Sequence, residues 1–333
     1  MNIYDISKQA GVSIATVSRV INGNANVSQK TKDKVMAVID ECGYTPNAFA
    51  RGLGLNTMNT IGILCADSSD PYHAQAIFYL EQMLRQNGYD ALLCCTGYEL
   101  EQKQKYLNLL LSKRVDGIIL VGSNFVEAKD PKNEYIRQAS KQVPIMLLNG
   151  ALNGENIYST LCDDFHAIYD ATSSLIRSGV KDILYLYNAK SYSGTKKLDG
   201  YMAALKDHDI GYNKDKVRYY SGTIEGVKEY LLSLSKENLQ FNGIITSDDS
   251  LAVGALKYAK ASNLIVPKDL SIIGYNNSII STCCDPELTS IDNKLETVCK
   301  NCITTLMGVF AEEHVPLKTV FPAEIIKRET TLF

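Results

Sequence analysis

Short apolar runs alternate with longer amphipathic stretches from Thr60 onward, and a second series of the same kind begins after Lys181. The runs are TIGILCA, DALLCCT, DGIILVG and PIMLLNG, followed by DILYLYN, VRYY, GIITS and LSIIGYN. Each is bounded by turn residues and has the length of a buried strand, and the stretches between them have helical periodicity. Strands that alternate with helices predict a parallel sheet covered on both faces, so the two series predict an α/β protein with two lobes.

The first 46 residues have a different pattern, with three helical repeats in place of strands. Ile3, Ile6 and Ala10 repeat at helical spacing, Gly11 can adopt the left-handed conformation that ends a helix, and Ser13 can cap the next one. Apolar positions in the second helix and in a third, at 28–42, predict a small shared core. Two helices joined by a tight turn and packed on a third form a helix-turn-helix unit.

The outward face of the second helix is made of small, apolar and hydrogen-bonding residues beside one guanidinium, that of Arg19. Such a face suits the major groove of DNA. The segments GVSIATVSRVIN, NVSQKT and GYTPNAFARGL occur in this order and spacing, and in this the chain resembles the LacI/GalR family of transcription regulators. The resemblance implies a DNA-binding headpiece at 1–46, a hinge or linker at 47–59 and an effector-binding and dimerisation domain at 60–333.

The resemblance also assigns roles to individual headpiece residues. Ile14, Ala15 and Arg19 are expected to read base edges, and Arg19 can bond a guanine with two hydrogen bonds. Leu53, between two glycines, is expected to push between base pairs in the minor groove. Expected phosphate contacts, for which capping and solvation are equally good interpretations, are Ser13, Thr16, Ser18 and Asn22.

The charge distribution indicates that one headpiece alone binds DNA weakly. Residues 1–60 carry six basic and four acidic side chains, a net charge of +2, against −3 for the whole chain. Two headpieces on a near-palindromic operator are therefore expected, which requires a homodimer. The last residues, up to Phe333, contain no heptad repeat that would form a tetramer. Candidate interface segments are the helix that begins near Ala74, with Ile77, Leu80 and Leu84, and residues 103–111, although core packing explains the same pattern.

A ligand site is expected in the loops after the strands, because open sheets of this kind bind ligands beyond the carboxyl ends of their strands. These loops carry hydroxyl, amide and charged groups with aromatic rings among them, the chemistry that a polyol requires. The expected effector-binding residues are Asp70, Tyr72, His73, Ser123, Asn149, Ser191, Ser193, Lys197, Tyr220, Asp249, Tyr275 and Asn276. Asn124 and Asp248 lie in the same loops.

The second half of the chain resembles the same family, and through it the periplasmic sugar-binding proteins, in KLDGYMAAL, SDDSLAVGALKYA and VPKDLSIIGYNN. The resemblance implies an N-lobe at about 60–160 and 292–321 and a C-lobe at about 161–291 and 322–333. Two positions depart from the family pattern. Lys197 stands where the family usually has Arg, which loses the planar fork that holds two oxygens, and Ser221 stands where many relatives have an aromatic ring.

Other features narrow the function further. The chain has no stretch of eighteen apolar residues and no export signal at its start, so a bacterial cytoplasmic protein is expected, on the nucleoid when bound to its operator. Of nine cysteines, Cys299 and Cys302 form a CxxC pair without a second pair at metal spacing, which favours packing over a metal site. No cofactor is expected. The sequence shows no nucleophile with a base to activate it, so an enzyme is not expected. Asp248 and Asp249 are adjacent in sequence and therefore point in different directions, so they do not form a paired-carboxylate site.

The sequence thus predicts a repressor of a carbohydrate-utilisation operon, with operator affinity controlled by a small sugar in the cleft between the lobes. Most sugar-responsive members of the family are released from DNA by their ligand, so induction is expected. Two alternatives remain: the same regulator with a nucleoside or nucleobase effector, for which Tyr72 and His73 would stack equally well, and a cytosolic ligand-binding module without a DNA function.

Overall fold

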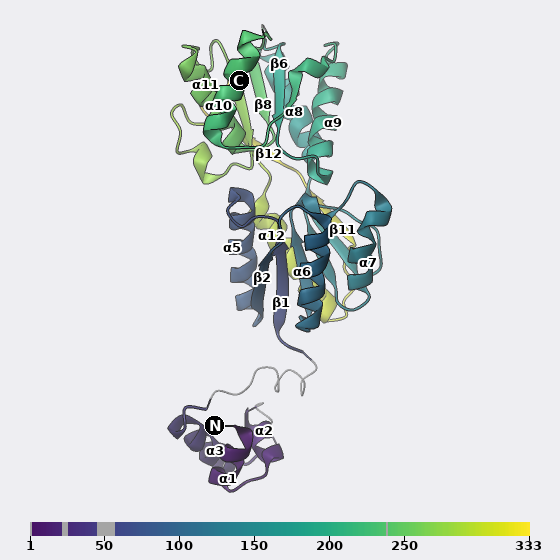
Figure 1. Ribbon diagram of the computed structural model, residues 1–333, viewed down its shortest axis with the longest axis vertical. Helices are drawn as coiled ribbons and strands as arrows, with labels where there is room; N and C mark the ends of the chain where they lie inside the picture. The colour runs from purple at the N-terminus through teal and green to yellow at the C-terminus, as the bar shows by residue number, and fades with distance from the viewer. Residues whose placement is uncertain (1, 22–25, 45–56, 238) are drawn as a thin grey trace. The chain divides into compact units, whose positions relative to one another are not determined.

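In a computed structural model of the chain, the described residues are 2–21, 26–44, 57–237 and 239–333. They separate into two compact units. One unit contains the three N-terminal helices and the other contains both α/β lobes (Figure 1). The predicted hinge residue Leu53 and the predicted phosphate contact Asn22 lie outside the described residues.

The N-terminal unit contains α1 (Ile3–Ala10), α2 (Ile14–Ile21) and α3 (Gln29–Glu41), as predicted. Asn2 and Asp5 form a reciprocal capping box at the start of α1, and Gly11 ends the helix with a φ of 58°. The three helices share a small core of buried side chains, namely Ile6, Ala10, Val17, Val20, Val35 and Ile39.

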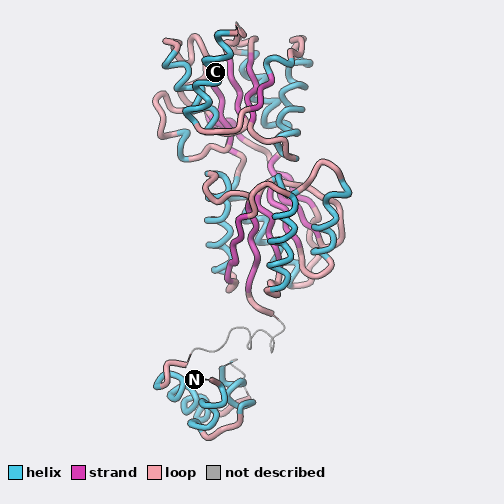
Figure 2. The backbone as a smooth tube through the Cα atoms, in the orientation of Figure 1, coloured by secondary structure: helices cyan, strands magenta, loops and turns pink. Residues whose placement is uncertain are grey.

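Each lobe is built on one six-stranded sheet with helices on both faces (Figure 2). The N-lobe sheet has the order β11-β5-β4-β3-β1-β2. Its strands are β1 (Thr60–Cys65), β2 (Asp90–Cys95), β3 (Gly117–Val121), β4 (Ile145–Leu148), β5 (Ile157–Cys162) and β11 (Lys318–Phe321). Its helices are α5 (Pro71–Gln86), α6 (Leu100–Ser112), α7 (Glu134–Ser140) and α12 (Leu295–Phe310).

The C-lobe sheet repeats this order as β12-β10-β9-β8-β6-β7. Its strands are β6 (Ile183–Tyr187), β7 (Val217–Tyr219), β8 (Gly243–Thr246), β9 (Ser271–Tyr275), β10 (Ser290–Asp292) and β12 (Glu324–Ile326). Helices α8 (Asp164–Arg177) and α9 (Tyr192–Asp207) cover one face, and α10 (Ile224–Lys236) and α11 (Asp249–Ala261) cover the other (Figure 1). Short 3-10 turns at Ser123–Phe125, Asp130–Asn133, Lys214–Lys216 and Ile279–Ser281 complete the two lobes.

The N-lobe core contains several apolar residues for which the sequence left two interpretations open. Leu80 and Leu84 of α5 are fully buried against the sheet, and Ile77 packs beside them. Cys299 and Cys302 of α12 are also fully buried in this core, so the CxxC pair packs as small apolar side chains. These residues serve the lobe's own core, and the predicted interface pattern of α5 is explained by that packing.

The chain passes between the lobes three times, after β5, after β10 and between β11 and β12. Strand β1 pairs with β3 and β6 with β8 in the parallel sense, whereas β12 pairs with β10 in the antiparallel sense. Because the lobes share the same strand order, the carboxyl ends of both parallel sheets supply loops to one cleft.

Candidate DNA-binding surface and ligand cleft

The recognition helix α2 buries one face and exposes the other. Val17 and Val20 are buried in the headpiece core, whereas Ile14, Ala15 and Arg19 are exposed. Ser13 caps the helix, because its hydroxyl accepts a hydrogen bond from the Thr16 amide at 3.1 Å and contacts the Thr16 hydroxyl at 2.9 Å. The three residues expected to read bases therefore lie on one solvent-facing surface, and Ser13 and Thr16 also serve the helix start. Ser18 is half-buried between the two faces.

A cleft of about 670 Å³ lies between the two lobes. Nine of the predicted effector-binding residues line it: Asp70, Tyr72, His73, Ser123, Asn149, Ser191, Ser193, Lys197 and Asn276. Asn124 and Asp248 line it as well. A hydrogen bond of 2.7 Å between the hydroxyls of Ser123 and Ser191 joins its two walls directly.

Helix starts set the position of several cleft residues. Asp70 caps α5 by accepting hydrogen bonds from the amides of Tyr72 and His73, Ser191 caps α9, and Asp248 caps α11. His73 is buried, and its Nδ1 lies 2.9 Å from the carbonyl oxygen of Asp67. These caps fix the polar side chains before any ligand is bound.

A buried charge cluster lies beneath the C-lobe wall. The Lys197 ammonium donates a hydrogen bond of 3.0 Å to the Ser247 carbonyl and lies 3.4 Å from the centre of the Tyr275 ring. The Tyr275 hydroxyl donates a hydrogen bond to Asp164. Burial lowers the pKa of Lys197 and raises the pKa of Asp164, while the attraction between the two charges opposes both shifts.

Asp248 is the acidic group that faces the cleft from the C-lobe. It accepts hydrogen bonds from the Leu251 amide at 2.9 Å and from the Asn188 side chain. The pKa of its carboxyl group is raised to about 6, chiefly by burial and in smaller part by the charge of Asp70 across the cleft. The carboxylate is therefore ionised at neutral pH, but burial makes its charge unfavourable. A ligand hydroxyl that donates a hydrogen bond to it would reduce this free-energy cost.

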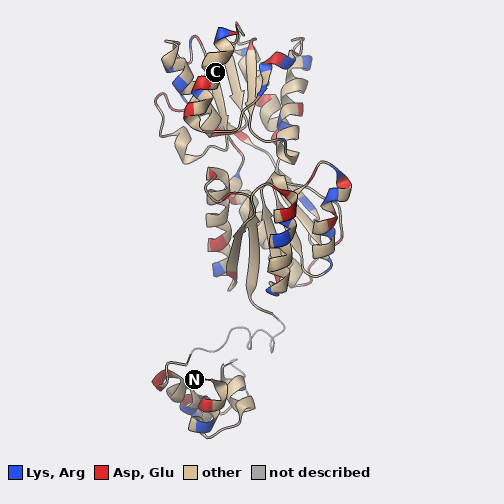
Figure 3. Ribbon diagram, in the orientation of Figure 1, with Lys and Arg blue, Asp and Glu red and all other residues tan. Residues whose placement is uncertain are grey.

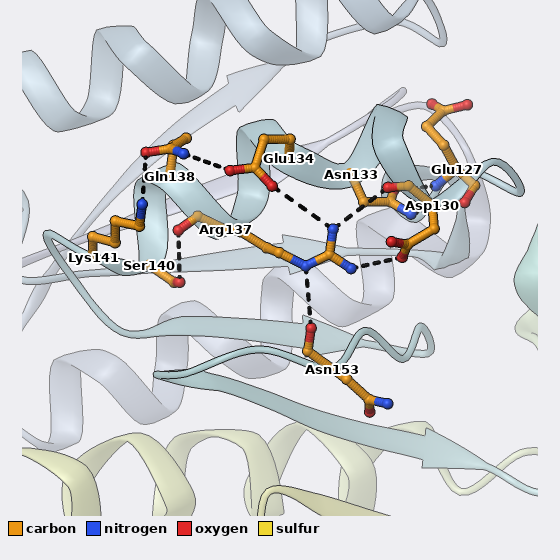
Figure 4. Close-up of polar contacts among 9 residues, drawn as sticks. All are labelled: Glu127, Asp130, Asn133, Glu134, Arg137, Gln138, Ser140, Lys141 and Asn153. Carbon is orange, nitrogen blue, oxygen red and sulfur yellow. Dashed lines mark hydrogen bonds and ion pairs between the residues drawn. The ribbon is translucent and has the colours of Figure 1, made fainter.

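One wall of the cleft comes from the N-lobe segment 123–132, and a polar network holds it in place (Figure 4). Asn133 accepts a hydrogen bond from the Glu127 amide at 2.7 Å and donates one to the Glu127 carbonyl at 2.9 Å. Arg137 forms a 2.6 Å ion pair with Asp130 and bonds the Asn153 carbonyl. Lys103, which is buried, donates to Glu127 at 2.8 Å. The wall is thus tied to α6 and α7.

The architecture and the cleft match known families. Residues 58–329 match the model of periplasmic binding proteins and the sugar binding domain of the LacI family, and residues 2–47 match that of bacterial regulatory proteins of the lacI family. The chain belongs to the LacI family. This LacI-family chain is a DNA-binding transcription regulator, as its relatives are.

Two relatives and one solved structure illustrate the match. An HTH-type transcriptional regulator of Lachnoclostridium phytofermentans is 58% identical over 333 residues, 100% of both chains. Catabolite control protein A of Priestia megaterium is 33% identical over 294 residues, 87% of each chain. A lac repressor dimer bound to operator and the anti-inducer ONPF has a TM-score of 0.89 at 24% identity and covers 100% of this chain and 99% of its own, which shows the shared fold.

Three residues of this LacI-family regulator that were predicted to bind the effector do not line the cleft, so their predicted position at the cleft is wrong. The Tyr220 ring turns toward the C-lobe core and stacks on Tyr230 at 5.2 Å. Asp249 is buried and accepts hydrogen bonds from Ser278 and Ser290. Tyr275 is buried beneath Lys197. Each lies beside a residue that does face the cleft, because neighbouring residues at a strand end or helix start point in different directions.

Several cleft residues were not predicted from the sequence. Tyr98, Lys190, Asn188 and Tyr219 all line the cleft. Tyr219 ends β7 one residue before Tyr220, so the alternation of side chains along a strand was the signal that distinguishes the two. Asn188 follows β6 directly, so it could have been predicted, because ligands bind beyond the carboxyl ends of strands in sheets of this kind. Tyr98 follows β2 by three residues, where sequence alone gives no direction.

Within the part of the chain that the structure describes, no helix has the length and apolar character needed to cross a membrane.

Proposed function

We propose that this regulator is a cytoplasmic repressor of a carbohydrate-utilisation operon, and that a small sugar in the cleft between the lobes controls its affinity for DNA. The observation that carries the proposal is the cleft lining. Hydroxyl, amide and carboxylate groups from both lobes, with tyrosine rings among them, converge on one cavity. Such groups bond the hydroxyls of a sugar, and the rings pack on its C–H faces.

The geometry favours a sugar over a nucleobase. A planar base requires a parallel ring or slot to stack in. The rings of Tyr72 and His73, which the sequence suggests for stacking a base, are 5.7 Å apart at an interplanar angle of 67°. His73 is also buried, and its Nδ1 contacts a backbone carbonyl. These two rings therefore do not form a flat slot between them.

Ligand binding would act on DNA binding through the lobes. A ligand that contacts both walls stabilises one arrangement of the two lobes over others, and only such a difference in affinity can shift an equilibrium. Coupling of this kind typically amounts to about 1 to 3 kcal/mol. We propose that the sugar favours the arrangement with low DNA affinity and so acts as an inducer.

We also propose a homodimer on a near-palindromic operator. The outer strand β2 exposes Leu92 and Leu93, and α5, which packs against it, exposes Phe78. An exposed apolar edge strand of this kind is suited to cover by a second copy. In the matched lac repressor structure, the protein is a dimer on its operator. Asn22 and Leu53 stay in the proposal as contacts to phosphate and to the minor groove.

The test of the DNA-binding surface is a gel shift with the full-length protein and the region upstream of its own gene. Arg19→Ala should cost about 1 to 3 kcal/mol per half-site and relax specificity at one base pair, because the bond to a guanine is lost. Arg19→Lys is the matched control, since it keeps the charge but loses the planar fork. It should retain the salt dependence of binding and lose the base discrimination.

An unchanged footprint for Arg19→Ala would contradict the assignment of α2 as the base-reading helix. Absence of any specific shift with the parent protein, at low salt and with or without sugars, would favour a ligand-binding module without a DNA function.

A further inference from the structure

Two exposed tyrosines lie at the cleft, one from each lobe. Tyr98 follows β2 in the N-lobe and Tyr219 ends β7 in the C-lobe, and both line the cavity. Their side chains are 57% and 46% exposed, whereas Ser193 and Lys197, which line the same cavity, are buried. The cleft therefore has a buried polar floor and an aromatic outer part. Large exposed rings in a concave site indicate contact with a ligand.

The Tyr219 ring is held by its neighbours, and the turn that carries Tyr98 is fixed by the backbone. The rings of Tyr219 and Tyr187 pack in an edge-to-face arrangement, with their centres 5.5 Å apart and an interplanar angle of 69°, and the Lys190 ammonium lies 5.2 Å from the centre of the Tyr219 ring. The turn that carries Tyr98 is fixed at its start by two backbone hydrogen bonds of 2.9 Å. The Thr96 amide donates to the Cys65 carbonyl, and the Gly97 amide donates to the Ala66 carbonyl. Rings positioned in advance lose little conformational freedom when they bind.

The two rings border one cavity from different lobes. Tyr98 and Tyr219 both line it, Tyr98 from the N-lobe and Tyr219 from the C-lobe. A ligand that extends from the floor toward solvent can therefore contact a ring from each lobe.

The cavity is larger than one sugar bound at its floor would fill. A volume of about 670 Å³ corresponds to about twenty water molecules at ~30 Å³ each, and one six-membered sugar displaces only a minor part of them. The polar groups that suit a first sugar are concentrated on the floor, at Ser191, Ser193, Lys197 and Asp248. The remaining space, between floor and solvent, is bordered by Tyr98 and Tyr219.

We propose that the effector is an oligosaccharide of at least two sugar units, with the inner unit on the polar floor and the next unit packed against Tyr98 and Tyr219. The inference rests on the proposed sugar effector and adds its size and a second subsite. Aromatic rings bind the apolar C–H faces of sugars and tolerate different hydroxyl patterns, so the outer subsite selects for chain length and the floor selects the sugar.

Calorimetric titration of the full-length protein with matched sugars tests the proposal. The probes are glucose with cellobiose, glucose with maltose, xylose with xylobiose, and mannose with mannobiose. At least one disaccharide should bind about ten-fold or more tightly than its monosaccharide, which is about 1.4 kcal/mol. Tyr98→Ala and Tyr219→Ala should each remove most of this gain, and so weaken binding of the disaccharide far more than binding of the monosaccharide. Tyr98→Phe and Tyr219→Phe should keep it.

Tyr212→Ala is the control for loss of an exposed tyrosine in the C-lobe, since Tyr212 is 53% exposed and is not among the residues that line the cleft. It should behave as the parent protein does. Equal affinity for both members of every pair, or an equal loss for both in the alanine variants, would overturn the outer subsite while a sugar effector stands. If none of these sugars binds, the sugar effector and the outer subsite both fail, whereas DNA binding is judged separately by the gel shift.

Discussion

The outer strands of the two lobes occupy the same place in their sheets but differ in what they expose. β2 lies beside β1 at the edge of the N-lobe sheet, and β7 lies beside β6 at the edge of the C-lobe sheet. β2 is six residues long, with Leu92 36% and Leu93 41% exposed and Asp90 as its one charged residue. β7 has three residues, and the segment before it forms an ion pair between Lys216 and Asp182.

The difference indicates that the lobes have different tasks. A short edge strand with charged neighbours resists pairing with another chain, whereas a longer apolar edge invites it. Charged side chains are spread over both lobes, but β2 is almost entirely uncharged (Figure 3). The N-lobe edge is therefore the surface proposed for the dimer.

The largest expected effect comes from a charge on the N-lobe edge. Leu93→Glu should raise the dimer dissociation constant about 100-fold or more, because a carboxylate buried without a partner costs several kcal/mol. Sedimentation velocity measures the change. Ile279→Glu, at a C-lobe residue that is 74% exposed, is the matched control and should leave the dimer intact. A Leu93→Glu variant as dimeric as its parent would remove the proposed role of β2.

A second test compares how tightly the helices of each lobe pack. A methyl group on Gly200 would lie 2.2 Å from the carbonyl oxygen of Phe165, where α9 meets the backbone of α8. A methyl group on Gly62 would meet the Leu110 side chain at 2.5 Å, and that side chain can move. Gly200→Ala should therefore cost about 2 to 3 kcal/mol of stability, and Gly62→Ala about 1 kcal/mol. Urea denaturation midpoints measure both, and a larger loss for Gly62→Ala would contradict the comparison.

A third, smaller effect concerns pH. The pKa of Asp248 is raised to about 6 in the folded protein, chiefly by burial, against an ordinary value of 3.8. Between these values the folded state binds more protons than the unfolded state, so this group lowers stability as the pH rises through about 4 to 6. Asp248→Asn should stabilise the protein at pH 7 by about 1 to 2 kcal/mol, and the gain should vanish below about pH 4.

Asp70→Asn sharpens the pH test from the N-lobe side. Removing the Asp70 charge should move the descending part of the stability curve to lower pH, since that charge contributes to the raised pKa of Asp248. Melting temperatures measured across pH 4 to 8 follow both variants. A gain in Asp248→Asn that does not change with pH would show that titration of Asp248 is not its cause.

The sequence predicted the strand and helix order well, because most strands are uninterrupted apolar runs that are buried on both faces. β5 was missed since Tyr158, Ser159 and Thr160 interrupt its apolar character, although Ser159 and Thr160 are buried there. β10 and β12 were also missed, because the sequence has no bounded apolar run at either position. β10 is held by its pairing with β9 and β12, and both short strands adjoin segments where the chain crosses between the lobes.

For the site, the position of each loop was predictable and the direction of each side chain was not. The rule for strand ends located Asp70, Ser191 and Asn276 correctly at the cleft. It could not separate Asp248 from Asp249, because that choice depends on which residue caps α11. It does not separate Tyr219 from Tyr220 either, and only the alternation of side chains along β7 distinguishes those two. Tyr98 lies in the loop after the edge strand β2, and its place at the cleft depends on tertiary structure.

One ligand in the cleft is proposed to change the affinity of the headpieces for DNA. Fluorescence anisotropy of the full-length dimer on its upstream operator, titrated with the sugar that binds most tightly in calorimetry, measures this coupling. Saturating sugar should raise the dissociation constant for the operator by about 5- to 150-fold, the range of a 1 to 3 kcal/mol coupling. An operator affinity that stays the same when the cleft is saturated would show that the cleft does not control DNA binding.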